Sequence, residues 1–128
     1  MEKEFVTYEQ ALALKELGFD EMCLGYFDSK SELAFNTNGN PISKDWVWFG
    51  NQCLPVDMTL APLKQQVFRW FREKYEWITN IRHNKSPDMS GKQYYFEYGY
   101  RNSYERYVTY EEAENACIDK LIEIAKQK

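Results

Sequence analysis

The pattern of apolar and polar positions along the chain predicts three helices. Apolar residues recur at helical spacing within residues 63–75, and a wide apolar stripe follows residues 110–126. A third predicted helix, residues 8–17, stops at Gly18, which suits the left-handed position that follows a helix end. Pro62 fits the first position of the central helix, because its missing N–H would have no partner there.

A heptapeptide that opens two of these helices occurs twice, almost unchanged. Residues 5–11 read Phe-Val-Thr-Tyr-Glu-Gln-Ala, and residues 107–113 read Tyr-Val-Thr-Tyr-Glu-Glu-Ala. Thr7 and Thr109 can each accept a hydrogen bond from the first helical turn. The Gln or Glu three residues later can bond back to the cap, which completes a capping box. The repeat therefore predicts helix starts, and it fits both a duplicated half and convergence on one capping device.

Runs of aromatic and β-branched residues between the helices predict strands. The longest run, residues 93–101, places its even-numbered aromatic residues, from Tyr94 to Tyr100, on one face and Tyr95 on the other. Asn102 and Ser103 follow this run and predict a turn. Further strands are predicted at residues 22–27, 32–35, 46–49, 77–81 and 104–108, whereas residues 50–61 show no regular pattern.

The order of these elements predicts an α+β fold in a single domain of residues 1–128. The links between successive strands are short, so we expect a largely antiparallel sheet of about four to six strands with three helices packed on it. We expect the even-numbered aromatic row to lie in the core beneath the helices. The alternative is that part of this row forms an exposed stacking platform.

Composition limits the possible partners. The chain of 128 residues has a net charge of −4, which disfavours a long nucleic acid because phosphate-backbone binding needs a basic surface. The charge is uneven, since residues 65–106 hold eight Lys or Arg and five Asp or Glu. No apolar run reaches the roughly 20 residues that span a membrane. No basic start precedes an apolar stretch, so we expect a cytoplasmic protein without a membrane partner.

Motifs for catalysis and metal binding are scarce. His83 is the only histidine, and it is therefore the only imidazole base available to a Ser or Cys nucleophile. Three cysteines are an odd number, which favours reduced thiols, and only Cys53 falls on a predicted loop where a thiol could react. The carboxylates at 111, 112 and 114 fit the first turn of a helix. We expect no catalytic residue, metal or cofactor, and hence a protein that is not an enzyme.

Three helical segments also resemble a known group of proteins. The segments read TYEQALALKELGF from residue 7, APLKQQVFRWFREKY from residue 61 and TYEEAENACIDKLIEI from residue 109. In these segments the chain is similar to a family of small uncharacterised proteins from bacteriophages and related bacterial genomes. The family has no assigned activity, so the resemblance implies a context, a phage accessory protein in a bacterial host cell, and no catalytic residue. A helical frame with variable strands and loops suits recognition.

The surplus of aromatic residues, 17% of the chain, points to a binding surface. Interfaces favour Tyr, Trp and Arg, and base–aromatic stacking contributes about 1–3 kcal/mol per base. The candidate binding residues combine aromatic rings with cations of the basic segment. They are Trp46, Trp48, Arg69, Arg72, Arg82, Tyr95, Arg101 and Arg106.

Three functions fit this surface. We favour a protein that binds a host protein, for host takeover or defence evasion. The first alternative is sequestration of a small molecule such as a signalling nucleotide, which needs no long basic track. The second alternative is a homo-oligomeric structural or assembly factor that uses the same aromatic surface.

Overall fold

The computed structural model describes residues 2–28, 30–35, 48–49, 52–53, 59–84, 91–99, 101–103 and 105–127. The chain divides into two compact units, Met1–Leu63 and Lys64–Lys128, and each is treated by itself. Both units combine helices with antiparallel strands, so the α+β prediction is confirmed. A single domain over residues 1–128 stays a prediction.

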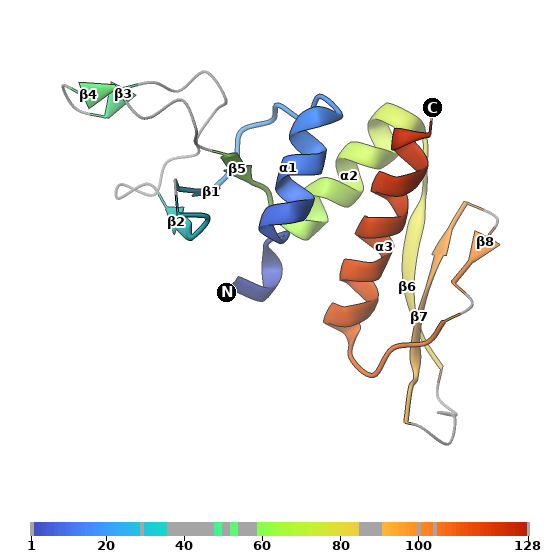
Figure 1. Ribbon diagram of the computed structural model, residues 1–128. Helices are drawn as coiled ribbons and strands as arrows, with labels where there is room; N and C mark the ends of the chain where they lie inside the picture. The colour runs from blue at the N-terminus through green and yellow to red at the C-terminus, as the bar shows by residue number, and fades with distance from the viewer. Residues whose placement is uncertain are drawn as a thin grey trace. The chain divides into compact units, whose positions relative to one another are not determined.

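The first unit holds a short 3-10 helix, one α-helix and an antiparallel sheet (Figure 1). The sheet has the strand order β2-β1-β5, and α1 packs against β5. Two further short strands, β3 and β4, pair with each other. The elements are η1 (Glu2–Glu4), α1 (Tyr8–Glu16), β1 (Gly25–Phe27), β2 (Leu33–Phe35), β3 (Trp48–Phe49), β4 (Gln52–Cys53) and β5 (Thr59–Ala61).

Helix α1 starts and ends as its sequence predicts. The Thr7 hydroxyl accepts a hydrogen bond from the Gln10 backbone N–H, and the Gln10 side chain accepts one from the Thr7 N–H, so the capping box is complete. Gly18 has φ 95°, and the Phe19 N–H donates to the Leu14 carbonyl at 2.9 Å. These bonds satisfy orphan backbone groups at both helix ends.

The strands predicted within residues 22–27 and 32–35 pair as an antiparallel hairpin, but the segment that follows them needs a correction. Asp28 accepts hydrogen bonds from two turn N–H groups and so closes the link between β1 and β2. Residues 50–61 were expected to be irregular, yet Thr59–Ala61 forms β5 and pairs with β1. Pro62 does not open a helix, because its carbonyl accepts a bond from Val6 and the helix begins only at Lys64. Long-range pairing with the N-terminal segment holds this stretch extended.

The second unit packs two helices with a second three-stranded sheet. Its sheet has the order β6-β7-β8, and all neighbours are antiparallel. Helix α3 contacts both β6 and β7, and it also contacts α2 (Figure 1). The elements are α2 (Lys64–Tyr75), β6 (Thr79–His83), β7 (Tyr94–Tyr98), β8 (Arg101–Asn102) and α3 (Tyr110–Lys126).

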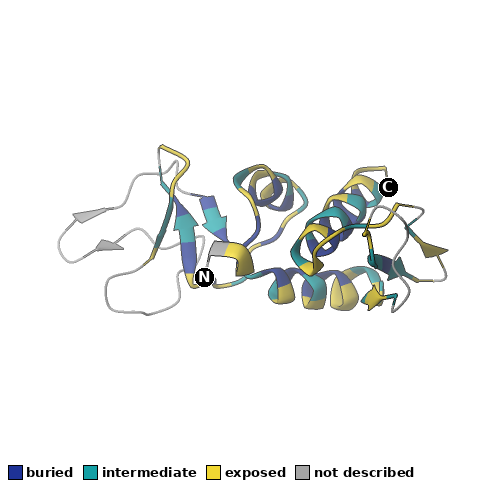
Figure 2. Cartoon of the chain, turned by 90° about the horizontal axis from the view of Figure 1, so that it is seen from below, coloured by how far each residue is buried: buried dark blue, intermediate teal, exposed yellow. Residues whose placement is uncertain are grey.

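The apolar stripes of the two long helices are buried as their spacing predicts. Along α2 the residues Val67, Trp70 and Phe71 are buried, and Figure 2 shows buried and exposed residues recurring along the helices. Helix α3 buries Cys117, Ile118 and the other residues of its stripe. Burial of these stripes is the main stabilising contribution in the unit.

Strand β6 begins later than the sequence predicts, at Thr79 instead of residue 77. Helix α2 ends at Tyr75, and Glu76 adopts a left-handed φ of 60°. The Trp77 ring then stacks on the Tyr75 ring, with centroids 4.6 Å apart. Trp77 therefore folds back on the helix, and pairing with β7 starts beyond it.

The end of β7 also needs a correction. The strand ends at Tyr98, and the chain turns at Gly99, which has φ 60°, instead of at Asn102 and Ser103. A glycine adopts this left-handed conformation without a steric cost. Arg101–Asn102 then forms β8, and the expected strand 104–108 is reduced, in its described part, to a bridge between Tyr107 and Tyr94. Tyr100 lies outside the described residues.

The predicted single sheet of four to six strands is not confirmed. The described strands fall into two sheets of three and one of two. None of the helices formed by the described residues is both long and apolar enough to cross a bilayer.

Candidate functional site

The two faces of β7 differ in character. Phe96 is 4% exposed, and its ring stacks on the Tyr107 ring at 6.2 Å. Tyr94 contacts the Tyr110 ring at the start of α3. The even-numbered aromatic residues of β7 therefore lie on the face that α3 covers. The expected core position is confirmed for Phe96, whereas Tyr94 and Tyr98 are only half-buried.

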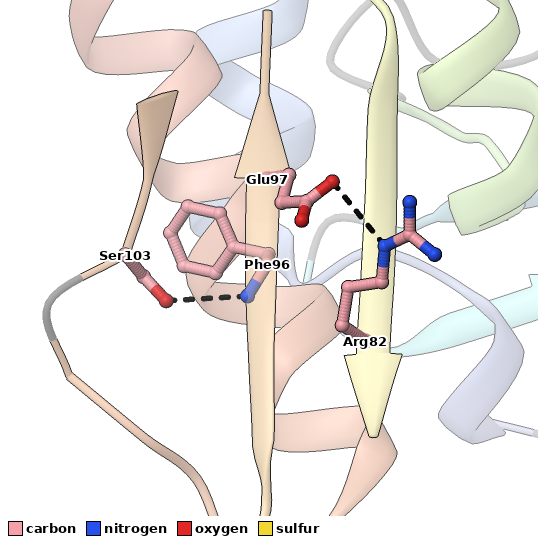
Figure 3. Close-up of polar contacts among 4 residues, drawn as sticks. All are labelled: Arg82, Phe96, Glu97 and Ser103. Carbon is pink, nitrogen blue, oxygen red and sulfur yellow. Dashed lines mark hydrogen bonds and ion pairs between the residues drawn. The ribbon is translucent and has the colours of Figure 1, made fainter. Parts of the chain in front are cut away.

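The odd-numbered side of β7 forms what we name the open face. Tyr95 and Glu97 lie here, opposite Arg82 and Asn80 of β6, because side chains of paired residues share a face. Figure 3 shows Arg82 and Glu97 reaching toward each other on the side of the sheet away from α3. The open face comprises Ile78, Asn80, Arg82, Tyr95, Glu97 and Arg106.

Two arginines of this face make different contacts. The Arg82 Nε donates to the Glu97 carboxylate at 3.2 Å, so the charge of Arg82 is partly balanced. The Arg106 guanidinium lies over the Tyr95 ring, 5.2 Å from its centroid. Such a cation–π pair contributes about 0.5–1 kcal/mol at an exposed site. The contact restricts the side-chain rotamers of both Tyr95 and Arg106.

Ile78 adds an apolar side chain to the open face. It lies one residue before β6, and strand alternation places it on the side of Asn80 and Arg82. Its side chain is 62% exposed, the largest value among the big apolar residues described. The open face therefore offers an aromatic ring, an exposed aliphatic group and two guanidinium groups.

A groove of about 270 Å³ runs beside β6. Residues Gln65, Phe68 and Arg72 of α2 form one wall, and residues 77–81 form the other. Tyr110, at the start of α3, completes the lining. Among the described residues that line the groove, Arg72 is the only charged one, and no described side chain forms an ion pair with it.

Gln65 and Tyr110 contribute polar side chains to this groove. The Gln65 side-chain NH₂ donates to the Glu114 carboxylate at 3.1 Å. Burial of the Tyr110 hydroxyl raises its pKa, and the carboxylates of Glu114 and Glu111 raise the pKa further. The phenol is therefore neutral, and able to donate, near pH 7.

A second hollow, of about 450 Å³, lies between α3 and the β8 side of the sheet. Its described lining residues include the carboxylates of Glu105, Asp119 and Glu123 and one cation, Lys120. The Lys120 ammonium lies 3.7 Å from Glu123. This hollow is acidic, so an anionic ligand would bind in the groove beside β6 instead.

The structure brings three of the eight predicted binding residues together, Arg82, Tyr95 and Arg106. Arg72 lies apart from them in the groove, whereas Arg69 of α2 does not line it. Arg101 is exposed on β8, in register with Tyr98 instead of with the open face. Trp46 lies outside the described residues, as does the side chain of Trp48, whose backbone belongs to β3.

Four residues of the open face and the groove are not among the predicted binding residues: Ile78, Asn80, Phe68 and Tyr110. Strand alternation along residues 77–81 indicates the face on which Ile78 and Asn80 lie. Ile81 pairs with Phe96 on the buried side, so Asn80 and Ile78 belong to the opposite face. Nothing in the helix pattern places Phe68 beside a strand edge.

The thiols and potential metal ligands do not add to the site. Cys23 and Cys117 are buried, and this burial raises the pKa of each thiol to about 12. The predicted reactive residue, Cys53, belongs to β4, but its side chain lies outside the described part. Across the described ranges, no group of three or more His, Cys, Asp or Glu residues converges as a metal site requires. His83 instead contacts the Tyr94 ring at 4.9 Å.

Comparison with protein-family models, with curated proteins and with solved structures finds no match to this chain.

Proposed function

We propose that this chain is a non-enzymatic binding protein that recognises a partner protein through its open face. The Tyr95 ring beneath the Arg106 guanidinium is the observation that carries the proposal. Tyr and Arg are enriched among the residues that dominate interface energies. Their mutual contact reduces the side-chain entropy that a partner would otherwise have to remove on binding.

The surroundings of this pair also suit a protein partner. Ile78 offers exposed apolar area, and the Arg82–Glu97 ion pair offers both a donor and an acceptor group. Mixed charges beside an aromatic centre are typical of a protein interface with a polar rim. A nucleic acid would meet the Glu97 carboxylate and a chain of net charge −4.

The biological setting of this proposal rests on the resemblance of the three helical segments. A phage accessory protein in the bacterial cytoplasm would use the open face on a host protein, in host takeover or in defence evasion. Sequestration of a signalling nucleotide is the second candidate. It is favoured by the groove, whose lining combines Arg72 with the aromatic residues Phe68 and Trp77.

Capture from bacterial lysate with matched variants tests the proposal. We expect wild-type protein to enrich one host protein and the double variant Tyr95→Ala/Arg106→Ala to lose it. With the purified partner, Tyr95→Ala should weaken binding by at least about thirtyfold, as expected for a hot-spot residue. Arg101→Ala is the control, because it removes an exposed cation of the same sheet outside the open face. Equal binding by the double variant and wild type would contradict the proposal.

A further inference from the structure

The outer edge of β6 carries backbone groups that point away from β7. The Gly99 N–H donates to the Ile78 carbonyl, and the Asn84 N–H donates to the Gln93 carbonyl. In an antiparallel pair the hydrogen-bonded positions alternate. The backbone groups of Ile78, Asn80 and Arg82 therefore occupy the positions that hydrogen-bond to β7. The N–H and C=O groups of Thr79 and Ile81 point the other way, toward the free edge of the sheet.

This edge is unpaired within the described part of the second unit. The sheet order β6-β7-β8 leaves β6 at one side, and no described backbone group bonds to Thr79 or Ile81 there. Both residues are only half-buried. An exposed row of alternating donors and acceptors is a template for another strand.

The groove follows this same edge. Five consecutive residues, 77–81, line it, and successive residues of a strand belong to opposite faces. The hollow therefore borders the backbone edge itself. On its other side lie Phe68 and Arg72, and Arg72 carries the single charge among the described lining residues.

We propose that the edge of β6 binds an extended, acidic peptide segment by strand addition. The Thr79 and Ile81 backbone groups pair with the peptide backbone, and Arg72 binds an Asp or Glu side chain of the peptide. Phe68 and Ile78 contact its apolar side chains. Backbone pairing supplies affinity in this mode, and the pockets beside the edge supply specificity.

An extended peptide matches the backbone groups of this edge better than a nucleotide does. A phosphate would engage Arg72, but it would leave the outward N–H and C=O groups of Thr79 and Ile81 without matched partners. An extended chain presents donors and acceptors at the same two-residue repeat, about 6.6 Å. This inference rests on the proposed function, since it names the element of the partner protein that the second unit recognises.

Selection from a yeast-displayed library of short random peptides tests the inference on the full chain. We expect enriched peptides to combine alternating apolar residues with an Asp or Glu. The best peptide, synthesised with a fluorescent label, should bind Arg72→Ala about tenfold to a hundredfold more weakly than wild type, because a charge-assisted hydrogen bond is lost. Arg69→Ala is the matched control, since Arg69 lies on the same helix outside the groove.

Amide hydrogen exchange of the wild-type protein supplies a second readout that needs no variant. Peptide binding should slow exchange at the Thr79 and Ile81 amides most strongly. Failure to enrich acidic peptides would overturn the inference. So would protection centred on Tyr95 and Glu97, or unchanged affinity in Arg72→Ala. Binding that depends on Tyr95 and not on Arg72 would refute the edge site while leaving the open face as the interface. Binding that depends on neither Tyr95 nor Arg72 would refute both proposals.

Discussion

The repeated heptapeptide places the same helix cap in two environments. At Thr7, the hydroxyl accepts the Gln10 N–H at 3.2 Å, and the Gln10 side chain accepts the Thr7 N–H at 3.0 Å. Gln10 is buried, at 4% exposure. At Thr109, the hydroxyl accepts the Glu112 N–H at 3.2 Å, but the Glu112 carboxylate accepts from Val108 and the bonds are exposed. The box is complete only at the first site.

These differences set the expected cost of removing each cap. Replacement of an N-cap Thr by Ala costs about 0.5–2 kcal/mol. Thr7→Ala leaves the part-buried Gln10 N–H without its acceptor, whereas the bond from the backbone N–H of residue 7 to the Gln10 side chain is kept. We expect about 1.5–2 kcal/mol, the upper part of this range, because the orphaned N–H is part-buried. Water can replace the hydroxyl at the exposed Thr109, so Thr109→Ala should cost about 0.5–1 kcal/mol.

Urea denaturation followed by circular dichroism measures both losses. Thr7→Ser and Thr109→Ser keep the hydroxyl and serve as controls that should stay close to wild type. Equal losses in the two Ala variants would refute the argument from burial. No loss in Thr7→Ala would refute the capping interpretation of the repeat.

Two further predictions concern the core. Trp70 is 6% exposed and packs edge-on against Phe71. Trp70→Ala should therefore lower the free energy of unfolding, measured by urea titration, by about 3–5 kcal/mol. A variant as stable as wild type would place this ring at a binding surface instead. The pKa of both Cys23 and Cys117 is raised to about 12, chiefly by burial, while thiols in the unfolded chain ionise near pH 8.5. The thiols' contribution to stability is therefore complete below about pH 8.5 and is lost as the pH rises toward 12. Denaturation at a series of alkaline pH values should show this loss of stability, and the Cys117→Ala variant should lose less. Equal pH dependence in the variant and wild type would contradict the contribution of the Cys117 thiol.

Local signals predicted the helices well because their determinants lie within a few residues. The cap at Thr7, the glycine ending at Gly18 and the Asp28 turn each depend on neighbours in sequence. The errors arise where distant pairing decides. Thr59–Ala61 is extended because it pairs with β1, and Pro62 bonds to Val6 instead of opening α2.

The candidate site was partly predictable for the same reason. The residue types predicted Tyr95, Arg82 and Arg106 as binding residues. Strand alternation predicted that Tyr95 lies on the face opposite the even-numbered aromatic residues. Their convergence depends on the register that pairs Arg82 with Tyr95, which periodicity alone does not define. The groove beside β6 was missed because it requires knowing which strand lies at the sheet edge and which helix borders it.

Native mass spectrometry tests most directly whether this chain binds a protein. The purified chain would be measured alone and after incubation with bacterial lysate separated into protein and small-molecule fractions. We expect a discrete complex from the protein fraction, absent for Tyr95→Ala/Arg106→Ala, and an unchanged mass with the small-molecule fraction. A discrete added mass of several hundred daltons from the small-molecule fraction, with no complex from the protein fraction, would contradict the proposal and identify a sequestering protein.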